Sequence, residues 1–516
     1  LHDVELFNAL AMNEVPGHEY PQDKINENWK TVLRNQFHDI LPGSSIAEVY
    51  EDADAEYAQV LGSSWDHLQT ALKALASRVV MDGEKIVVFN SLSWDRCGTA
   101  ILPWSDELEG KVFVDDEGKL LEARIVETTS GKVVEIEVPN IPSFGYKAFR
   151  VKSQDEVQAA DQVTPEKTVR LEGRTIESPY YRIVLNEAGQ ITSLFDKEAD
   201  REVLPEGMAA NVIEAFEDKP MYYDAWDIDI YYREKPYAVQ HPVEWKVLEN
   251  GPSRVVIAFE WPFLQSTIKQ QMIVYSDRRR IDFKTEIDWN EHQILLKAAF
   301  PVDVRSTKAT YEIQFGNVER PTHWNTSWDY AKFETCAQKW VDLSQRDYGV
   351  SLLNDCKYGH DVKDNIMRIT LLKSGIEPDP NADHGHHEFT YSLLPHSGDW
   401  YEANTTQEAY ELNYPLRAVY TQSPAGSLPE EQSFIKVKGE GVILETVKKS
   451  EKDSSLVLRF YEYGNRRSTV EVELVAELSS VEECNLMEEE CQAVPFTGKT
   501  FSFDIDPYEI KTFKIR

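Results

Sequence analysis

The sequence lacks any long hydrophobic run and has few basic residues for its length. No apolar stretch approaches the ~20 residues that a membrane-spanning helix needs, so we expect no membrane segment. Its 54 Lys and Arg stand against 89 Asp and Glu, which gives a formal net charge of −35. A surface that binds nucleic acid needs clustered cations to neutralise phosphates. We therefore expect no nucleic-acid partner.

Cysteine is also scarce, with five residues in a chain of 516. They are odd in number, scattered, and include no CxxC pair, the spacing typical of zinc ribbons and thiol redox centres. Such a pattern favours reduced thiols in a cytoplasmic protein over a disulfide framework. The five residues are Cys97, Cys336, Cys356, Cys484 and Cys491.

A chain of this length should hold several domains. Apolar residues recur with helical spacing in residues 1–80, which predicts three or four antiparallel helices packed as a bundle. The period then changes to that of short strands in residues 84–152, which predicts a small antiparallel β-sandwich. Residues 153–167 lose most aliphatic and aromatic side chains, and this composition is typical of a linker.

From residue 168 onward the pattern is almost entirely β. A hairpin is predicted at residues 180–195, where two strands flank an Asn-Glu-Ala-Gly turn. Strand patterns fill residues 168–415, and no helical period separates the closest of them, which favours large stacked sheets. A further β module is expected over residues 416–516. The predicted fold class is therefore multidomain and mainly β, with an N-terminal helical bundle.

The stretch from Asn35 to Ile46, NQFHDILPGSSI, joins two helical patterns. An apolar stripe with a period of four predicts that the first helix ends at His38 and Asp39, and a Pro-Gly pair then breaks the chain. A capping box at Ser45 and Glu48 marks the start of the next helix. From these residues alone, His38 could cap the helix and Asp39 could open the turn. The alternative is that His38 is a metal ligand and Asp39 a substrate contact.

A second metal-like cluster is Asp383-His384-Gly-His386-His387. On a strand, His384 and His386 would share a face, as two metal ligands need. A surface loop without a metal is the favoured interpretation. A third interpretation is that the loop, with Asp383, reaches the rim of a ligand site.

Residues 222–229 form an aromatic and acidic string of the kind that sugar sites use. Ring faces contact the C–H surfaces of sugars and carboxylates accept hydrogen bonds from hydroxyls. Asp224 and Trp226 are the candidate contacts. The alternative is a strand end in which Trp226, Ile228 and Ile230 pack inward.

The string NQFHDILPGSSI, preceded by Trp29-Lys30, closely resembles the helical middle domain of glycoside hydrolase family 38, the zinc-dependent α-mannosidases. The hairpin at 180–195 is similar to the start of the mutarotase-like supersandwich of those enzymes. Further strings resemble bacterial members of the family, namely MYYDAWDIDIYY (221–232), FGNVERPTHWNTSWDYAKFE (315–334), YGVSLLNDCKYG (348–359), PDPNADHGHHEFTYSLLPH (378–396) and the closing PYEI.

The resemblance implies roles for individual residues. His38 corresponds to one of four protein ligands of the catalytic zinc, and Asp39 to a residue that contacts the sugar. The loop that contains Asp383 lies near the active site in the family. The nucleophile and the acid/base are both Asp residues of an upstream α/β domain with an HxD motif, and no such motif precedes the predicted bundle here. We therefore expect no catalytic carboxylate in this chain.

The sequence thus predicts the C-terminal portion of a retaining, zinc-dependent α-mannosidase that hydrolyses terminal α-D-mannose from oligosaccharides and is inactive by itself. Its expected partners are an α-mannoside oligosaccharide and the upstream catalytic domain, and a homo-oligomer is left open. A mannosylglycerate-type hydrolase of the same family is one alternative. Others are a non-catalytic carbohydrate-binding or scaffold module, and a self-contained hydrolase that uses the histidines of residues 383–387.

Overall fold

Three helices occupy the first 80 residues of the computed structural model, namely α1 (His2–Glu14), α2 (Gln22–Asn35) and α3 (Ala47–Ala76). Gly62 lies inside α3, so the apolar patterns on its two sides form one continuous helix. A single interior glycine costs only about 1 kcal/mol, and burial of Leu68, Leu72 and Leu75 offsets it. No helix in the described part of the chain is long and apolar enough to cross a membrane.

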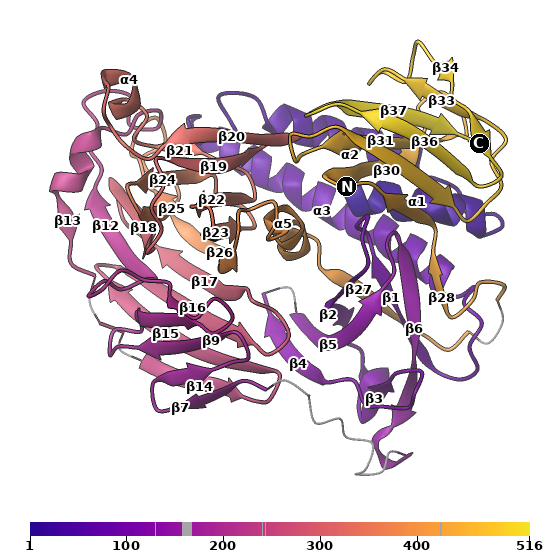
Figure 1. Ribbon diagram of the computed structural model, residues 1–516, viewed down its shortest axis with the longest axis horizontal. Helices are drawn as coiled ribbons and strands as arrows, with labels where there is room; N and C mark the ends of the chain where they lie inside the picture. Colours follow the sequence, from indigo (N-terminus) through magenta and orange to yellow (C-terminus); the bar gives the residue numbers. More distant parts are fainter. Residues whose placement is uncertain (130, 157–167, 240, 243, 424–425) are drawn as a thin grey trace. The chain divides into compact units, whose positions relative to one another are not determined.

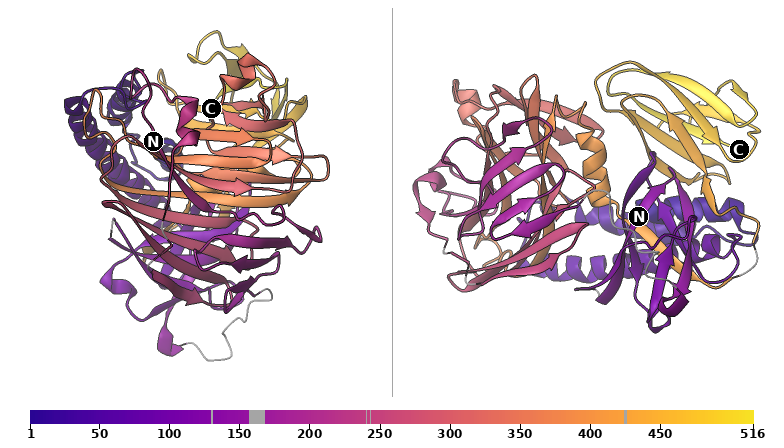
Figure 2. Two further views of the ribbon diagram at one scale, coloured as in Figure 1. Left: turned by 90° about the vertical axis from the view of Figure 1, so that its left-hand side faces the viewer. Right: turned by 60° about the horizontal axis from the view of Figure 1, so that its bottom comes forward.

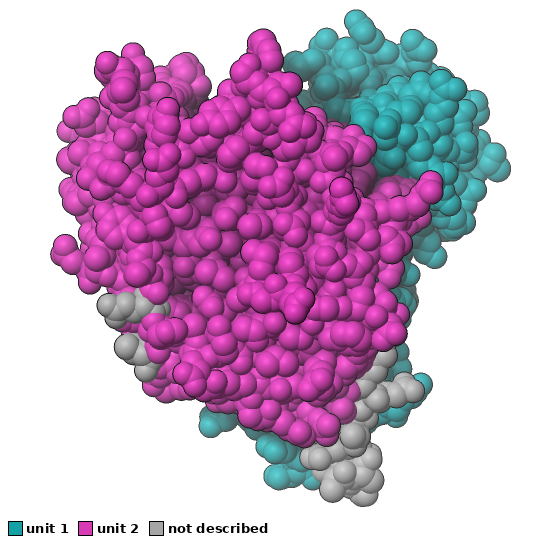
Figure 3. Space-filling model, turned by 60° about the vertical axis from the view of Figure 1, so that its left-hand side comes forward, with its two compact units in different colours: residues 1–35, 54–163, 414–516 teal, residues 36–53, 164–413 magenta. Residues whose placement is uncertain are grey.

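The structure describes residues 1–129, 131–156, 168–239, 241–242, 244–423 and 426–516. Residues 157–167 of the predicted linker therefore lie outside the described residues. The chain divides into two compact units (Figure 3). Unit 1 contains residues 1–35, 54–163 and 414–516, and unit 2 contains residues 36–53 and 164–413.

Unit 1 combines the helices with three sheets. The first sheet has the order β28-β6-β1-β27-β2-β5-β4, with β3 on β6. Its β27 and β28 come from near residue 420 and pair with strands near residue 90 and residue 146. The strands are β1 (Lys85–Asn90), β2 (Arg96–Pro103), β3 (Lys111–Val114), β4 (Ala123–Thr128), β5 (Gly131–Ile141), β6 (Gly145–Ser153), β27 (Leu416–Thr421) and β28 (Glu431–Ser433), with short helices η1 (Asp106–Leu108) and η2 (Gln154–Glu156) between and after them.

The two C-terminal sheets of unit 1 have the orders β29-β32-β36-β35 and β30-β31-β37-β33-β34. Helix α1 lies against β30, and their apolar side chains share one core (Figure 1). The strands are β29 (Ile435–Lys438), β30 (Val442–Lys449), β31 (Leu456–Glu462), β32 (Ser468–Leu474), β33 (Val481–Cys484), β34 (Gln492–Ala493), β35 (Phe496–Thr497), β36 (Thr500–Ile505) and β37 (Ile510–Ile515).

The prediction that all cysteines are reduced thiols is wrong for Cys484 and Cys491, which form a disulfide. Strands β33 and β34 pair antiparallel, with Glu482 opposite Ala493 and Glu483 opposite Gln492. Continuing this register places Cys484 directly opposite Cys491. Sequence spacing alone could not reveal this pair, because it depends on a hairpin.

Unit 2 contains three sheets around one large apolar core, as the strand patterns predicted, and all their strand pairs described are antiparallel. The small sheet has the order β11-β10-β9-β8-β7 and includes the predicted hairpin as β9 and β10. Its strands are β7 (Arg170–Glu172), β8 (Thr175–Glu177), β9 (Tyr181–Leu185), β10 (Ile191–Asp196) and β11 (Arg201–Glu202).

The other two sheets of unit 2 have six and nine strands. Figure 2 shows their long strands lying side by side. The six-stranded sheet contains β13 (Pro236–Tyr237), β12 (Val212–Glu217), β18 (Ile294–Pro301), β25 (Ile366–Lys373), β24 (Gly359–Lys363) and β21 (Thr335–Cys336), in that order. The nine-stranded sheet contains β14 (Glu244–Asn250), β15 (Arg254–Phe263), β16 (Ser266–Tyr275), β17 (Ile281–Trp289), β26 (Gly385–Ser397), β23 (Tyr348–Asn354), β22 (Trp340–Ser344), β19 (Lys308–Ile313) and β20 (Gly316–Pro321). Helices η4 (Ile230–Glu234), α4 (Ser327–Tyr330) and α5 (Thr405–Asn413) lie between strands.

Candidate functional site

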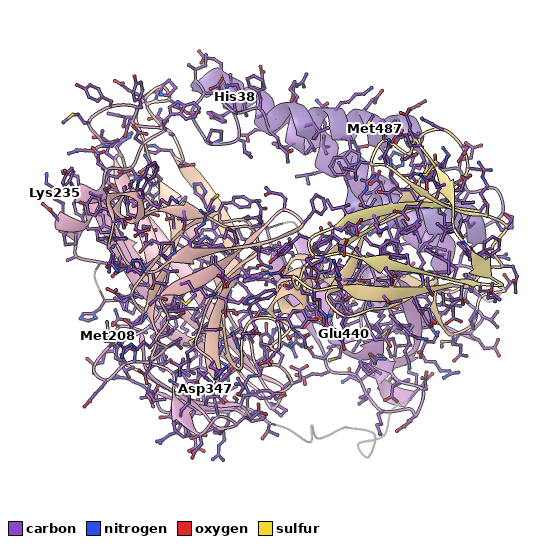
Figure 4. The ribbon with its side chains drawn as sticks, turned by 45° about the horizontal axis from the view of Figure 1, so that its top comes forward. His38, Met208, Lys235, Asp347, Glu440 and Met487 are labelled. Carbon is purple, nitrogen blue, oxygen red and sulfur yellow. A yellow bond between two sulfur atoms is a disulfide. The ribbon has the colours of Figure 1, made fainter. Side chains whose placement is uncertain are left out.

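His38 and Asp39 lie in the turn between α2 and α3, and not in the last turn of a helix as predicted (Figure 4). Helix α2 ends at Asn35, whose side-chain amide donates back to Thr31 O at 3.0 Å and to Glu56 Oε2 at 2.7 Å. These two hydrogen bonds fix the side chain of Asn35 at the C-terminal end of α2. Beyond it, Asp39 O accepts hydrogen bonds from the hydroxyls of Ser44 and Ser45.

The imidazole of His38 is 73% exposed, and its Nε2 lies 3.4 Å from Asp39 Oδ2. An exposed imidazole beside a carboxylate is a chemically suitable single ligand for zinc. A catalytic zinc needs at least three protein ligands. In the part of the chain that the structure describes, no group of three or more His, Cys, Asp or Glu could hold a metal ion. The donors of the described residues can therefore supply one ligand of a zinc site but not a complete set of ligands.

Three loops of unit 2 meet around Asp224. Its Oδ2 accepts a hydrogen bond from Ile376 N at 2.7 Å and one from Gln293 Nε2 at 3.5 Å. Its backbone oxygen accepts from Lys373 Nζ at 2.5 Å. Asp224 belongs to the loop after β12, Gln293 to the loop before β18, and Ile376 to the loop after β25. Asp224 therefore joins all three loops and fixes the conformation of its own.

Trp226 points outward from this fixed loop, with 53% of its surface exposed, and Tyr222 and Tyr223 beside it are also exposed. The backbone N–H groups of Trp226 and Asp227 both donate to Tyr223 O, at 2.8 and 2.9 Å, in a tight turn. The alternative in which Trp226 packs inward is therefore wrong. Ile228 of the same string does pack partly against the core, beside Phe216 and Tyr232.

Asp383 lies in the loop that joins β25 to β26, the same loop that contains Ile376. Burial raises the pKa of its carboxyl group, and the nearby charges of His387, Lys357 and Lys373 counteract that shift. A carboxyl group among several cations is suited to accept hydrogen bonds from ligand hydroxyls. Lys373, which donates a hydrogen bond to Asp224 O, is thus also one of the cations whose charge acts on Asp383.

The three histidines next to Asp383 do not share a ligand geometry. His384 Nε2 lies 3.0 Å from Glu291 O, His386 Nδ1 lies 2.8 Å from Asp288 Oδ1, and His387 Nε2 lies 2.7 Å from Asp383 O. Each ring is held by a different partner. The three rings therefore have no hydrogen-bond partner in common, and the interpretation as a loop without a metal stays a prediction.

Lys373, Asp218 and Gln293 were not identified from the sequence. Lys373 is the last residue of β25, directly after a run of apolar strand residues, and Asp218 directly follows β12. A lysine or aspartate at a strand end is usually solvated. Only the pairing of β12 with β18 and of β18 with β25 brings these strand ends together.

Three family models match the chain. The alpha mannosidase middle domain matches residues 1–75, the glycosyl hydrolases family 38 C-terminal domain matches residues 176–381, and the family 38 C-terminal beta sandwich domain matches residues 441–513. These matches contain His38, Asp224 and Trp226.

Relatives support the same assignment. Alpha-mannosidase 2C1 of Homo sapiens is 36% identical over 90% of this chain and 42% of its own length. Alpha-mannosidase G of Dictyostelium discoideum is 31% identical over 100% of this chain and 50% of its own length. The chain therefore spans half or less of the length of these curated relatives. The crystal structure of an alpha-mannosidase from Enterococcus faecalis V583 has the same fold, with a TM-score of 0.83 and 17% identity, over 99% of this chain and 65% of that one. The chain belongs to glycosyl hydrolase family 38 and contains the middle domain and the C-terminal domains of that family.

Proposed function

We propose that this chain supplies the sugar-binding loops and one zinc ligand of a retaining α-mannosidase that removes terminal α-D-mannose from oligosaccharides. The observation that carries the proposal is the loop of residues 218–229, where an exposed Trp226 is held rigidly beside a fixed Asp224. Sugars are recognised by such pairs of aromatic rings and carboxylates. The relatives named α-mannosidases add the substrate class.

Within this proposal each residue has a separate task. The ring of Trp226 packs against a C–H face of the sugar. Asp224 Oδ1 has no partner among the described atoms and accepts a hydrogen bond from a ligand hydroxyl or a bound water. Asp383 binds hydroxyls from the opposite loop, and Asp39 contacts the sugar that the zinc site holds.

His38 is proposed as one of the zinc ligands. When bound, zinc would hold sugar hydroxyls and stabilise a distorted ring beside the nucleophile. A retaining glycosidase also needs two carboxylates about 5–5.5 Å apart. Because half or more of the length of the relatives has no counterpart in these 516 residues, we assign the nucleophile, the acid/base and the remaining zinc ligands to polypeptide outside them. The chain alone is then inactive.

The remaining parts of the proposal rest on the family resemblance and on composition. They are the bundle packing of α1, α2 and α3, the mutarotase-like form of unit 2, the location in the cytoplasm and a homo-oligomeric state. The non-catalytic alternative differs in one measurable respect. A binding or scaffold module would bind mannosides without contributing to their hydrolysis in any longer polypeptide.

The test compares the 516-residue chain with a longer polypeptide that contains it and carries a family 38 catalytic domain. We expect hydrolysis of an aryl α-mannoside by the longer protein and none by the chain alone. In the longer protein His38→Ala should lower zinc content and turnover together, whereas Asp39→Asn should keep zinc and lower turnover. His241→Ala, which changes another exposed histidine, is the control. Full zinc content in the His38 variant would remove its assignment as a ligand.

A further inference from the structure

A single ammonium group balances a cluster of carboxylates at the end of β25. Lys373 Nζ lies 2.9 Å from Asp218 Oδ2, and the Asp218 side chain is only 2% exposed. Burial and the neighbouring Asp224 and Asp229 raise the pKa of Asp218, and Lys373 is the cation that counteracts them. The charge of Lys373 is also among those that counteract the raised pKa of Asp383. Without this ammonium group, the buried Asp218 would lose the cation that counteracts the effect of Asp224 and Asp229.

The same ammonium group is a mechanical link. Besides its ion pair with Asp218, it donates a hydrogen bond to Asp224 O at 2.5 Å. Lys373 itself is anchored in the six-stranded sheet, where it lies opposite Leu295 of β18. One side chain therefore ties both ends of the segment from Asp218 to Asp224 to a strand of the core.

The strand that carries Lys373 leads directly into the second loop. Ser374 O accepts from Gln293 N, and Ile376 N donates to Asp224 Oδ2 at 2.7 Å. The loop with Trp226 and the loop that leads to Asp383 thus meet within a few residues of Lys373. A shift of the ammonium group would change the position of both.

We propose that Lys373 is a positioning residue of the mannoside site, which couples the loop of Trp226 to the loop of Asp383 so that both face the same sugar. This inference rests on the proposed function. Lys373 does not touch the sugar in this arrangement. Its contribution is to fix the distance between the ring of Trp226 and the carboxyl group of Asp383, and it therefore acts on substrate affinity.

The link is tested first without activity, on the 516-residue chain. Hydrogen exchange measured by mass spectrometry should be roughly ten- to hundredfold faster for peptides of residues 218–229 and 374–384 in Lys373→Met, the range expected for loss of one or two charge-assisted hydrogen bonds. Lys373→Arg should restore slow exchange. The control is Lys219→Met, which removes an exposed lysine of the same loop that pairs with Glu217. Unchanged exchange in Lys373→Met would overturn the link.

If Lys373→Met does not fold, the double variant Lys373→Met/Asp218→Asn removes the ammonium group and its buried partner together, which is tolerated better than removal of one charge. It still lacks the donor to Asp224 O, so it should also exchange faster in residues 218–229. Slow exchange in this folded variant would equally overturn the link.

The role in binding is tested in the longer active protein. Lys373→Met should raise KM for an aryl α-mannoside by roughly ten- to hundredfold with a much smaller change in kcat. Lys373→Arg should bring KM most of the way back to the value of the unmodified protein. Faster exchange with an unchanged KM would overturn the positioning role and leave the proposed function intact. Absence of mannoside hydrolysis by the unmodified protein would overturn the proposed function and this role together, while the exchange result would still report on the link.

Discussion

Asp342 and His396 form a buried hydrogen-bonded pair, with Asp342 Oδ2 at 2.9 Å from His396 Nε2. Ser351 Oγ lies 2.8 Å from the same carboxylate oxygen and 3.2 Å from the same nitrogen. These are the residue types of a hydrolytic triad, but a triad places Asp and Ser at opposite nitrogens of the imidazole. Here one nitrogen faces both, and all three side chains are buried. The cluster joins β22, β23 and β26 to Thr405 of α5, and its role is structural.

Ser351→Ala should therefore destabilise the protein without affecting catalysis. The change removes the hydrogen bonds of the Ser351 hydroxyl with Asp342 and Thr405, while Asp342 and His396 stay paired, at a cost of about 1–3 kcal/mol in the free energy of unfolding. Urea denaturation followed by tryptophan fluorescence measures this cost, with the exposed Ser502→Ala as the control. Mannoside hydrolysis by the longer protein should stay within twofold. A folded Ser351 variant that has lost its turnover would show that the cluster is catalytic.

His360 should make the stability depend on pH. It is fully buried on β24, and its Nε2 has no partner among the described atoms. Burial lowers the pKa of His360 to about 4, below the ordinary value near 6.5. The unfolded state thus binds a proton more readily than the folded state. The contribution of His360 to the free energy of unfolding is fully present above pH 6.5 and is lost as the pH falls through about 4. Its full size is about 3 kcal/mol.

The measurement is the free energy of unfolding at pH 7.5, 5.5 and 4.5 for the unmodified chain and for His360→Gln. The variant should be less stable at pH 7.5 but should lose less stability as the pH falls. His241→Gln, at an exposed position, should keep the slope of the unmodified chain. Equal slopes for the His360 variant and the unmodified chain would show that this histidine does not contribute to the pH dependence.

The sequence predicted local features well where a repeating pattern decides them. The hairpin of β9 and β10 and the long strands of unit 2 follow from alternation and turn residues. The end of α2 was placed three to four residues too late, because the bond from Asn35 to Glu56 joins two helices and has no signal in the periodicity of the sequence. The pairing of β1 with β27 joins residues more than 300 positions apart, and no local signal encodes it.

The residues of the candidate site also divide into those that a local sequence pattern reveals and those that only the tertiary structure brings together. Asp224 and Trp226 stood out because their string is rich in aromatic and acidic residues. Lys373 and Asp218 could not be recognised, since each looks like an ordinary polar residue after a strand. Their proximity depends on the order of β12, β18 and β25 in the sheet. Electrostatic partners that come from different strands need the tertiary structure to be identified.

Lys297 should be essential for stability. Its side chain is fully buried, pairs with Glu334, and lies 2.8 Å from Asp361 Oδ2. Removal of the ammonium in Lys297→Met leaves Glu334 without its lysine partner and Asp361 with its ion pairs to Arg233 and Arg368. We expect this change to cost about 3–5 kcal/mol. Lys308→Met, which breaks an exposed pair with Glu319, should cost at most about 1 kcal/mol. Urea midpoints at neutral pH compare the two variants, and equal small losses would contradict the structural role of the buried lysine.

The histidines of residues 384–387 should matter little for metal binding. His384, His386 and His387 each have their own partner in the loop or on β17, so none is oriented toward a shared ion. Replacing all three by Ala in the longer protein should leave zinc content, measured by plasma mass spectrometry, near that of the unmodified protein. A loss as large as that of His38→Ala would place the metal at this loop.

The disulfide between Cys484 and Cys491 should stabilise the hairpin of β33 and β34, which is connected to α2 through Glu451. The loop that it closes, with Met487 marked in Figure 4, places Glu488 against Ser450 Oγ at 2.8 Å and Glu451 N at 2.9 Å. The Glu451 carboxylate in turn accepts hydrogen bonds from Gln22 and Asn26 of α2. Opening the disulfide frees the loop and weakens this series of contacts.

Alkylation in denaturant should modify three cysteines in the unreduced chain and five after reduction, because only Cys97, Cys336 and Cys356 lie outside the disulfide. Loss of a closed loop of eight residues should lower the free energy of unfolding by about 2–3 kcal/mol. The double variant Cys484→Ser/Cys491→Ser should show this loss and no further response to reductant, whereas Cys336→Ser should behave like the unmodified chain. Hydrogen exchange should become faster in residues 448–452 of the double variant, since Glu488 no longer holds them. Modification of all five cysteines before reduction would mean that the two thiols are not joined, and would support the thiol state that the sequence predicted.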